Sequence, residues 1–124
     1  MPVLTENNRL DDVVLWEEDN QYSRDKITVL SGENLALAAV VGVVTASGKY
    51  AEYDPDATDG TEDAAGILVA AVDATAADQL GVAIVRDAMI VAEELVWNAG
   101  VDAAGKTAAL AELKALGIIV REQA

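Results

Sequence analysis

The sequence predicts a small, mainly β domain of barrel or sandwich type, with one C-terminal helix and an extended N-terminal arm. Three observations lead to this fold class. The chain has 124 residues, which suffices for one compact core. Short apolar runs alternate with turn residues through most of its length, and one late segment has helix-forming composition. Many closely spaced strands with a single helix are typical of a small β architecture.

We divide the chain into an arm, residues 1–30, and a β domain, residues 31–124. The start of the arm is the most polar stretch of the chain, and it contains one short apolar patch, Val13–Trp16. This patch is too short for a helix and has no neighbouring strand with which to form a hairpin, so it is predicted to be a single strand. Lys26–Leu30 forms a second short strand, which ends at the turn of residues 31–34.

The strands expected in the β domain are β-branched or alternate between apolar and polar residues, and turn residues bound them. A tight turn is expected at Ser47-Gly48, a turn or bulge at Arg86-Asp87, and an acidic loop at residues 54–63. The predicted strands cover residues 37–45, 49–53, 65–72, 81–85, 88–92, 95–97 and 118–120.

Residues 102–116 are predicted to form the one helix, because Ala, Leu, Lys and Glu dominate this segment. Asp102 is a suitable N-cap, and Gly117 suits the position that follows the C-cap. Leu110, Leu113 and Leu116 recur every third residue and form a narrow apolar stripe.

Charge and composition exclude several classes of function. The formal charge of −14 disfavours binding to nucleic acid or to anionic membrane surfaces. No apolar run is long enough for a membrane span, and the acidic N-terminus does not resemble a signal peptide. The chain has no cysteine and no histidine, which removes disulfides, thiolate metal sites and the commonest general base. An enzyme is therefore not expected, nor is a small-molecule substrate or cofactor.

The apolar half of the chain is dominated by 24 alanines, and it contains no phenylalanine. Alanine buries little apolar surface, so the core is thin for its composition. Small domains with thin cores often gain buried surface by assembling, which indicates an oligomer. A monomer of modest stability is also compatible with this composition.

Candidate ligand motifs do not have the spacing that their chemistry requires. Gly42 and Gly48-Lys49 are separated by five residues instead of four, and Tyr50 stands where a phosphate-binding loop has Ser or Thr. A hairpin turn explains these residues better. The acidic loop that begins at Asp54 has Asp59 where a calcium loop needs glycine, and Ala65 where it needs glutamate. A solvated turn is favoured over a weak calcium site, and no metal ligand is assigned.

The remaining polar groups do not form a catalytic set. In the adjacent pairs Glu17-Glu18 and Glu93-Glu94, neighbouring side chains of a strand point to opposite faces, so neither pair converges on a substrate. The serines have no histidine to activate them. Trp16 either packs on the core or anchors a partner, since tryptophan is enriched at binding hot spots. Trp97 is expected in the core or at a subunit interface.

Several segments follow one another in a characteristic order: Ala46–Pro55, Asp59–Leu68, Val72–Thr75, Val85–Asp87, Leu95–Trp97 and Leu116–Arg121. The most specific part is an Asp-Gly…Ala-Gly-Ile-Leu block followed by Leu-Val-Trp. Through these segments the chain resembles, from about residue 20 to residue 124, the lambda-type head decoration proteins (protein D family) of tailed phages and prophages. The arm also resembles that of prophage members, through Leu15 and the run Ser23–Val29.

This resemblance implies a β-clip fold and a homotrimer that binds the major capsid protein at three-fold sites on the outside of an expanded phage head. There it acts as a cement against internal DNA pressure, after synthesis in the bacterial host cytoplasm. Many members have proline after the tryptophan, whereas this chain has Asn98, which affects only the local turn. The alternative is a small non-enzymatic β interaction module of another surface assembly.

The arm is the expected capsid-binding element. Its acid-rich sequence holds little apolar surface, so it is expected to order only against a partner. Extended segments can add a strand to an exposed sheet edge, with alternate side chains filling pockets. The residues expected to make this contact are Val13, Leu15, Trp16, Ile27 and Val29.

Overall fold

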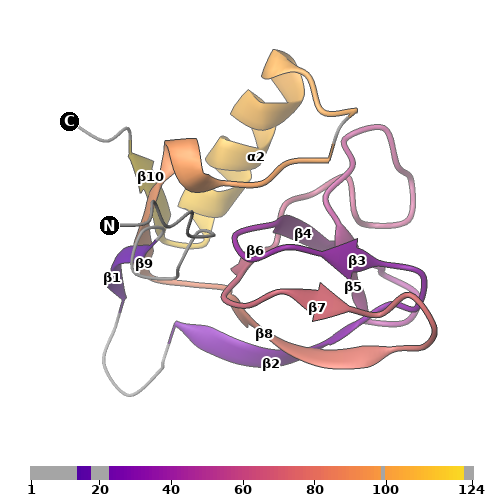
Figure 1. Cartoon of the computed structure of the whole chain (residues 1–124). Helices are drawn as coiled ribbons and strands as arrows, with labels where there is room; N and C mark the ends of the chain where they lie inside the picture. Colours follow the sequence, from indigo (N-terminus) through magenta and orange to yellow (C-terminus); the bar gives the residue numbers. More distant parts are fainter. Residues whose placement is uncertain (1–13, 18–22, 99, 122–124) are drawn as a thin grey trace, which may run out of the picture.

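The computed structural model describes residues 14–17, 23–98 and 100–121. It confirms a mainly β fold with a closed barrel and one C-terminal helix (Figure 1). The elements in chain order are β1 (Val14–Glu17), β2 (Arg24–Val29), β3 (Asn34–Leu35), β4 (Val40–Val43), β5 (Tyr50–Glu52), β6 (Gly66–Leu68), β7 (Val72–Asp73), β8 (Gln79–Ile84), β9 (Ala88–Val91), the 3-10 turn η2 (Ala92–Glu94), α2 (Ala103–Ala115) and β10 (Ile118–Arg121).

Five strands close the barrel in the order β2-β5-β4-β6-β8. The longest pairing is antiparallel, between β2 and β8, and runs from Arg24 opposite Ile84 to Val29 opposite Gln79. A parallel contact between Val29 and Tyr50 joins β2 to β5 and closes the ring. Each barrel strand therefore has a neighbour on both sides, although β2 meets β5 only at its last residue. The buried side chains of this region are Ile27, Val29, Leu35, Ala39, Val41, Leu68, Val72, Ala74, Ala83 and Val85.

Gly42 in β4 allows the acidic loop to cross closely over the barrel. A Cβ atom at this position would lie 2.7 Å from the Cα atom of Thr61 and 2.8 Å from the carbonyl oxygen of Asp63. Both of these are backbone atoms, so the loop would have to shift to accept any side chain. The glycine that interrupts the β-branched run therefore fixes the position of the loop of residues 54–63.

The second region is a three-stranded sheet, β1-β9-β10, with α2 packed beside β10 (Figure 1). β10 runs parallel to β9, whereas β1 is antiparallel to β9 and has an irregular register between Val14 and Trp16. A second core lies among this sheet, the helix and the barrel. Its buried members are Ala38, Val40, Tyr53, Ala64, Ile67, Ile84, Ala88, Ile90, Leu95, Val101, Ala109, Leu113 and Ile118.

The helix has the predicted ends, and one narrow face of it lies in the core. The Asp102 side chain accepts a hydrogen bond from the Gly105 N–H at 2.8 Å, and Gly117 follows the C-cap with φ +86°. The buried positions are Gly105, Ala109 and Leu113, spaced by four residues. Of the three leucines of the apolar stripe, Leu113 is buried, Leu110 is partly buried against the core, and Leu116 is 39% exposed.

Close packing explains the choice of face. A Cβ atom on Gly105 would lie 3.0 Å from Pro55 and 3.1 Å from Val101, so the start of the helix lies directly against the loop. Small residues at 105 and 109 permit this approach. The loop and the barrel thus bury Gly105 and Ala109 together with Leu113 of the leucine stripe.

Two predicted strands differ in the structure. Residues 95–97 form no strand; η2 precedes them, and Val96 makes one isolated bridge to Ala39. The apolar run 65–72 is divided into β6, in the barrel, and β7, which pairs with β3. The Arg86-Asp87 turn is confirmed, with Asp87 in the left-handed region at φ 45°.

Candidate functional site

The apolar patch of the arm lies on the small sheet. β1 pairs with β9 through Val14 opposite Ile90 and Trp16 opposite Met89. The single strand predicted at residues 13–16 is therefore present, and its partner comes from more than 70 residues away in the chain. Val13 lies outside the described residues, and for Leu15 and Trp16 only the backbone position is described.

The other two residues assigned to the arm lie within the barrel. Ile27 and Val29 are 5% and 0% exposed, and both pack in the barrel core. Their strand, β2, is paired on both sides, by β8 and β5. In this conformation neither side chain is accessible to a partner, whereas the β1 segment lies at the edge of a sheet.

The link between the arm and the barrel is fixed by polar contacts. The buried Ser23 hydroxyl donates a hydrogen bond to the Asp87 carbonyl at 2.6 Å, and the Val85 N–H donates to the Ser23 carbonyl at 2.8 Å. The Arg86 guanidinium binds both carboxylate oxygens of Asp25, at 3.1 and 2.8 Å. β2 therefore begins at a defined place, beside the turn that joins the barrel to the small sheet.

Trp97, expected in the core or at an interface, is half-buried at the edge of the second core. Its ring meets Tyr53 edge to face, with centroids 6.2 Å apart, and the Lys106 ammonium lies 5.9 Å from its centroid. The Tyr53 hydroxyl donates to the Gly105 carbonyl at 2.8 Å. Burial, followed by the surrounding carboxylates, raises the pKa of Tyr53. These contacts attach the helix to the barrel.

The carboxylates of the acidic loop are used to build its turns. Asp54 accepts a hydrogen bond from the Asp56 N–H at 3.0 Å, and Asp59 accepts from the Thr61 N–H and hydroxyl at 3.1 and 2.6 Å. The bonds from Thr61 lower the pKa of Asp59. Among the described residues, no group of three or more potential ligands could hold a metal ion. The loop conformation thus has a structural explanation in its own side chains.

A hydrogen bond joins the end of this loop to the helix. The Ala64 N–H donates to a Glu112 carboxylate oxygen at 3.2 Å, across 48 residues of sequence. Burial raises the pKa of Glu112, and a hydrogen bond with the Asp63 side chain raises it further. For the adjacent pairs Glu17-Glu18 and Glu93-Glu94, the expectation that the two side chains point to opposite faces stays a prediction. Glu18 lies outside the described residues, and the side chains of Glu17 and Glu93 are not described.

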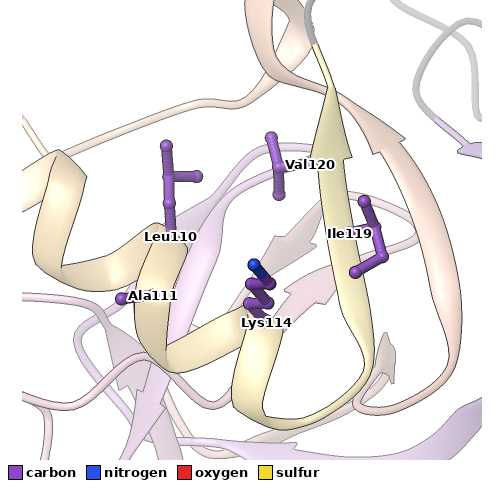
Figure 2. Close-up of a pocket in the computed structure, with 5 residues that line it drawn as sticks. All are labelled: Leu110, Ala111, Lys114, Ile119 and Val120. Atoms are coloured by element: carbon purple, nitrogen blue, oxygen red, sulfur yellow. The ribbon is translucent and has the colours of Figure 1, made fainter.

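A hollow between α2 and β10 was not found by sequence reasoning. It has a volume of about 270 Å³ and is lined by Leu110, Ala111, Lys114, Ile119 and Val120 (Figure 2). Four apolar side chains surround one ammonium group. The sequence feature that indicates this hollow is the turn at Gly117, which brings β10 back alongside the end of α2. Which side chains line the hollow depends on how the helix packs, and the sequence alone does not show this.

The arm strand thus lies at the edge of the small sheet, and most side chains that line the hollow are apolar. Within the described part of the chain, no helix is long and apolar enough to cross a membrane. No curated protein matches the chain significantly. The family model of the bacteriophage lambda head decoration protein D matches residues 3–118, which is most of the 124 residues.

The matched range begins in the arm and includes the whole barrel, the helix and the first residue of β10. Proteins of this family are structural components of phage capsids, and their place is the capsid surface of the virion. This confirms the resemblance noted in the sequence, and it identifies a phage capsid as the partner. The chain belongs to the bacteriophage lambda head decoration protein D family.

Proposed function

We propose that the protein binds as a homotrimer at three-fold sites on the outside of the expanded head and stabilises the shell against internal DNA pressure. The family match over residues 3–118 carries this proposal. The alanine-rich composition supports assembly, because a thin core gains stability from surface buried between subunits. A cyclic trimer also matches the symmetry of a three-fold site.

Binding to the major capsid protein is proposed to occur through the β1 segment of the arm, with Val13, Leu15 and Trp16 as the contact residues. In the described sheet β1 pairs only with β9, so one side of this strand remains for a further chain. An added strand would satisfy the backbone groups there. Ile27 and Val29 contribute from inside the barrel, by fixing the base of the arm.

Co-sedimentation with undecorated expanded heads tests the proposal. The full chain is expected to saturate the heads at three copies for each three-fold site. Loss of residues 1–17 is expected to abolish binding while the barrel stays folded, since β2 and the Ser23 and Arg86 contacts remain. If the shortened chain decorates the heads equally well, the binding surface lies on the globular domain.

Point variants sharpen this test. Trp16→Ala is expected to weaken head binding by about 1–3 kcal/mol per arm if the ring is a hot spot. Leu80→Ala is the matched control, because Leu80 is 78% exposed and lies on the barrel instead of the small sheet. Equal losses of head binding in the two variants would contradict the proposal that the arm is the capsid-binding element.

The stabilising role has a separate measurement. DNA-filled heads with and without bound protein are heated, and release of DNA is followed by dye fluorescence. Decorated heads are expected to release DNA at a higher temperature, because ligand bound to the intact shell stabilises it by mass action. Identical release temperatures with saturated binding would reject the cement function.

A further inference from the structure

Lys114 is one of three cations in the described part of this acidic chain whose side chains have no ion pair, hydrogen bond or ring contact there; the other two are Lys26 and Arg121. Lys49 is paired with Asp78 at 2.6 Å, Arg86 is paired with Asp25, and Lys106 lies over the Trp97 ring. Lys114 has no ion pair or hydrogen-bond partner for its side chain within the described residues. Its ammonium group lies instead among the apolar side chains of the α2–β10 hollow (Figure 2).

Exposed apolar side chains lie near this ammonium group, at the end of α2 and on β10. Among the described residues only three large hydrophobic side chains are exposed, and two of them, Leu116 and Ile119, lie at this end of the molecule, each 39% exposed. Ile119 lines the hollow, and Leu116 ends the helix beside it. An uncovered apolar surface with an unpaired cation fits a partner that is both apolar and acidic.

The acidic loop of residues 54–63 lies on the opposite flank of the same helix. Figure 1 shows this loop, in magenta, on one side of α2 and β10 on the other. The loop is fixed to the helix by the Ala64–Glu112 hydrogen bond and by Pro55 against Gly105. Asp56 is exposed on it, and its carboxylate accepts no hydrogen bond among the described residues. Pro55 and Ala57 provide apolar surface on either side of this carboxylate.

We propose that the α2–β10 hollow receives the loop of residues 54–63 from a second copy of this chain, with Asp56 of that copy paired to Lys114. The inference rests on the trimer of the proposed function and names the surfaces that build it. Copies with a formal charge of −14 repel one another, so their contact needs an opposite charge at the interface. An isologous contact of two hollows would place Lys114 against Lys114.

A contact between two different flanks of one helix is heterologous, and three such contacts can close into a ring. Each copy then supplies one loop and one hollow, and no loop or hollow inside the ring remains unfilled. The arm is not used in this contact and stays available for the capsid. Assembly and head binding therefore involve separate surfaces, and each can be lost alone.

Cysteine cross-linking tests the contact directly, because the chain has no cysteine of its own. Ala57→Cys and Ala111→Cys place one thiol on the loop and one at the hollow, and both leave Asp56 and Lys114 intact. The two single variants are mixed and treated with a short bismaleimide, in solution and on expanded heads. The expected product is a mixed dimer linked between positions 57 and 111, identified by mass spectrometry of the digested protein.

Ala70→Cys mixed with Ala111→Cys is the matched control, since Ala70 is exposed but lies between β6 and β7. A 57–111 product above this control, both in solution and on heads or on heads alone, supports the contact. Absence of that product under both conditions overturns it. Head binding of the wild-type chain is measured in parallel, so a protein that decorates heads without the 57–111 product refutes only this interface.

Charge reversal provides a second test. Lys114→Glu is expected to weaken association between copies by about tenfold or more, because it places two carboxylates together. Adding Asp56→Lys in the same chain restores opposite charges at every contact of the ring, and association is expected to recover. Lys26→Glu, on an exposed position of β2, is the control for net charge. No recovery in the double variant, or equal loss in the control, would overturn the pairing.

Discussion

The barrel and the small sheet differ in whether the edges of their strands are paired. All five barrel strands are paired on both sides, and their core is filled mainly by Ala, Val, Leu and Ile. The small sheet is open: β1 and β10 are its outer strands, and Ile119 remains 39% exposed on β10. A closed ring offers no edge to another chain, whereas an open sheet does. The proposed contacts with the capsid and between copies accordingly use the small sheet and its helix, whereas the barrel is expected to contribute most of the stability.

The largest effect of a substitution on stability is expected at Tyr53, where the barrel contacts the helix. Tyr53 is 1% exposed, and its hydroxyl binds the Gly105 carbonyl of α2. Tyr53→Ala is expected to lower the free energy of unfolding by about 3–5 kcal/mol, as for other large aromatic deletions. Tyr53→Phe keeps the ring but removes the hydrogen bond from its hydroxyl, with an expected loss of about 0.5–1.5 kcal/mol. Urea denaturation measures both, and equal losses would show that the ring contributes nothing beyond the hydrogen bond.

A matched pair of isoleucines compares a barrel strand with the open sheet. Ile67 on β6 is 1% exposed, whereas Ile119 on β10 is 39% exposed. Ile67→Ala is expected to cost about 2–5 kcal/mol of unfolding free energy. Ile119→Ala is expected to cost less than about 1 kcal/mol, since much of its surface is already in water. Its larger effect is expected in association between copies, measured by sedimentation, and the opposite ranking in stability would contradict the division of roles.

A smaller effect, with a defined pH dependence, is expected at the contact between the loop and the helix. The pKa of Glu112 is raised by burial and by Asp63, so the folded state binds this proton more tightly than the unfolded state does. The stability from this group is present at acidic pH and is lost as the pH rises through the raised pKa. Glu112→Gln is expected to stabilise the fold at pH 7 by less than about 1 kcal/mol, and not at pH 4.

Asp78→Asn is the control with the opposite sign. Hydrogen bonds from Lys49 and the Ser31 N–H lower the pKa of Asp78. Its contribution to stability is therefore present at neutral pH and is lost as the pH falls through the lowered value. Urea titrations of both variants at pH 7 and pH 4 are expected to show opposite trends. If the stability of both variants changed with pH in the same direction, the explanation of the raised pKa of Glu112 by burial and by Asp63 would be rejected.

The smallest effect is expected from calcium, magnesium and ATP. The carboxylates of Asp54 and Asp59 are already used as acceptors in the turns of the loop. Calorimetric titration is expected to show no saturable binding tighter than about millimolar, the range of weak calcium sites. Saturation at micromolar calcium would contradict this prediction and would show that the loop between the barrel and the helix binds a ligand.

Local features of the chain were predicted well, because they depend on neighbouring residues. The helix ends follow from Asp102, whose side chain accepts from the Gly105 N–H, and from Gly117. The turn at Arg86-Asp87 and most strands follow from β-branched runs bounded by turn residues. The mainly β fold and the family resemblance were equally accessible, since both rest on the order of short segments.

Tertiary structure alone decided which residues face a core and which strands pair. The alternation in β2 marks Ile27 and Val29 as one face, but only closure of the barrel determines that this face is inside. The leucine spacing in α2 marks an apolar stripe that includes the buried Leu113, but the burial of Gly105 and Ala109 depends on close packing against Pro55 and the core. The pairing of β1 with β9 joins segments that are distant in the sequence. The apolar side chains near Lys114 come from both α2 and β10. Periodicity within a segment specifies a face, whereas the surface that covers that face comes from elsewhere in the chain.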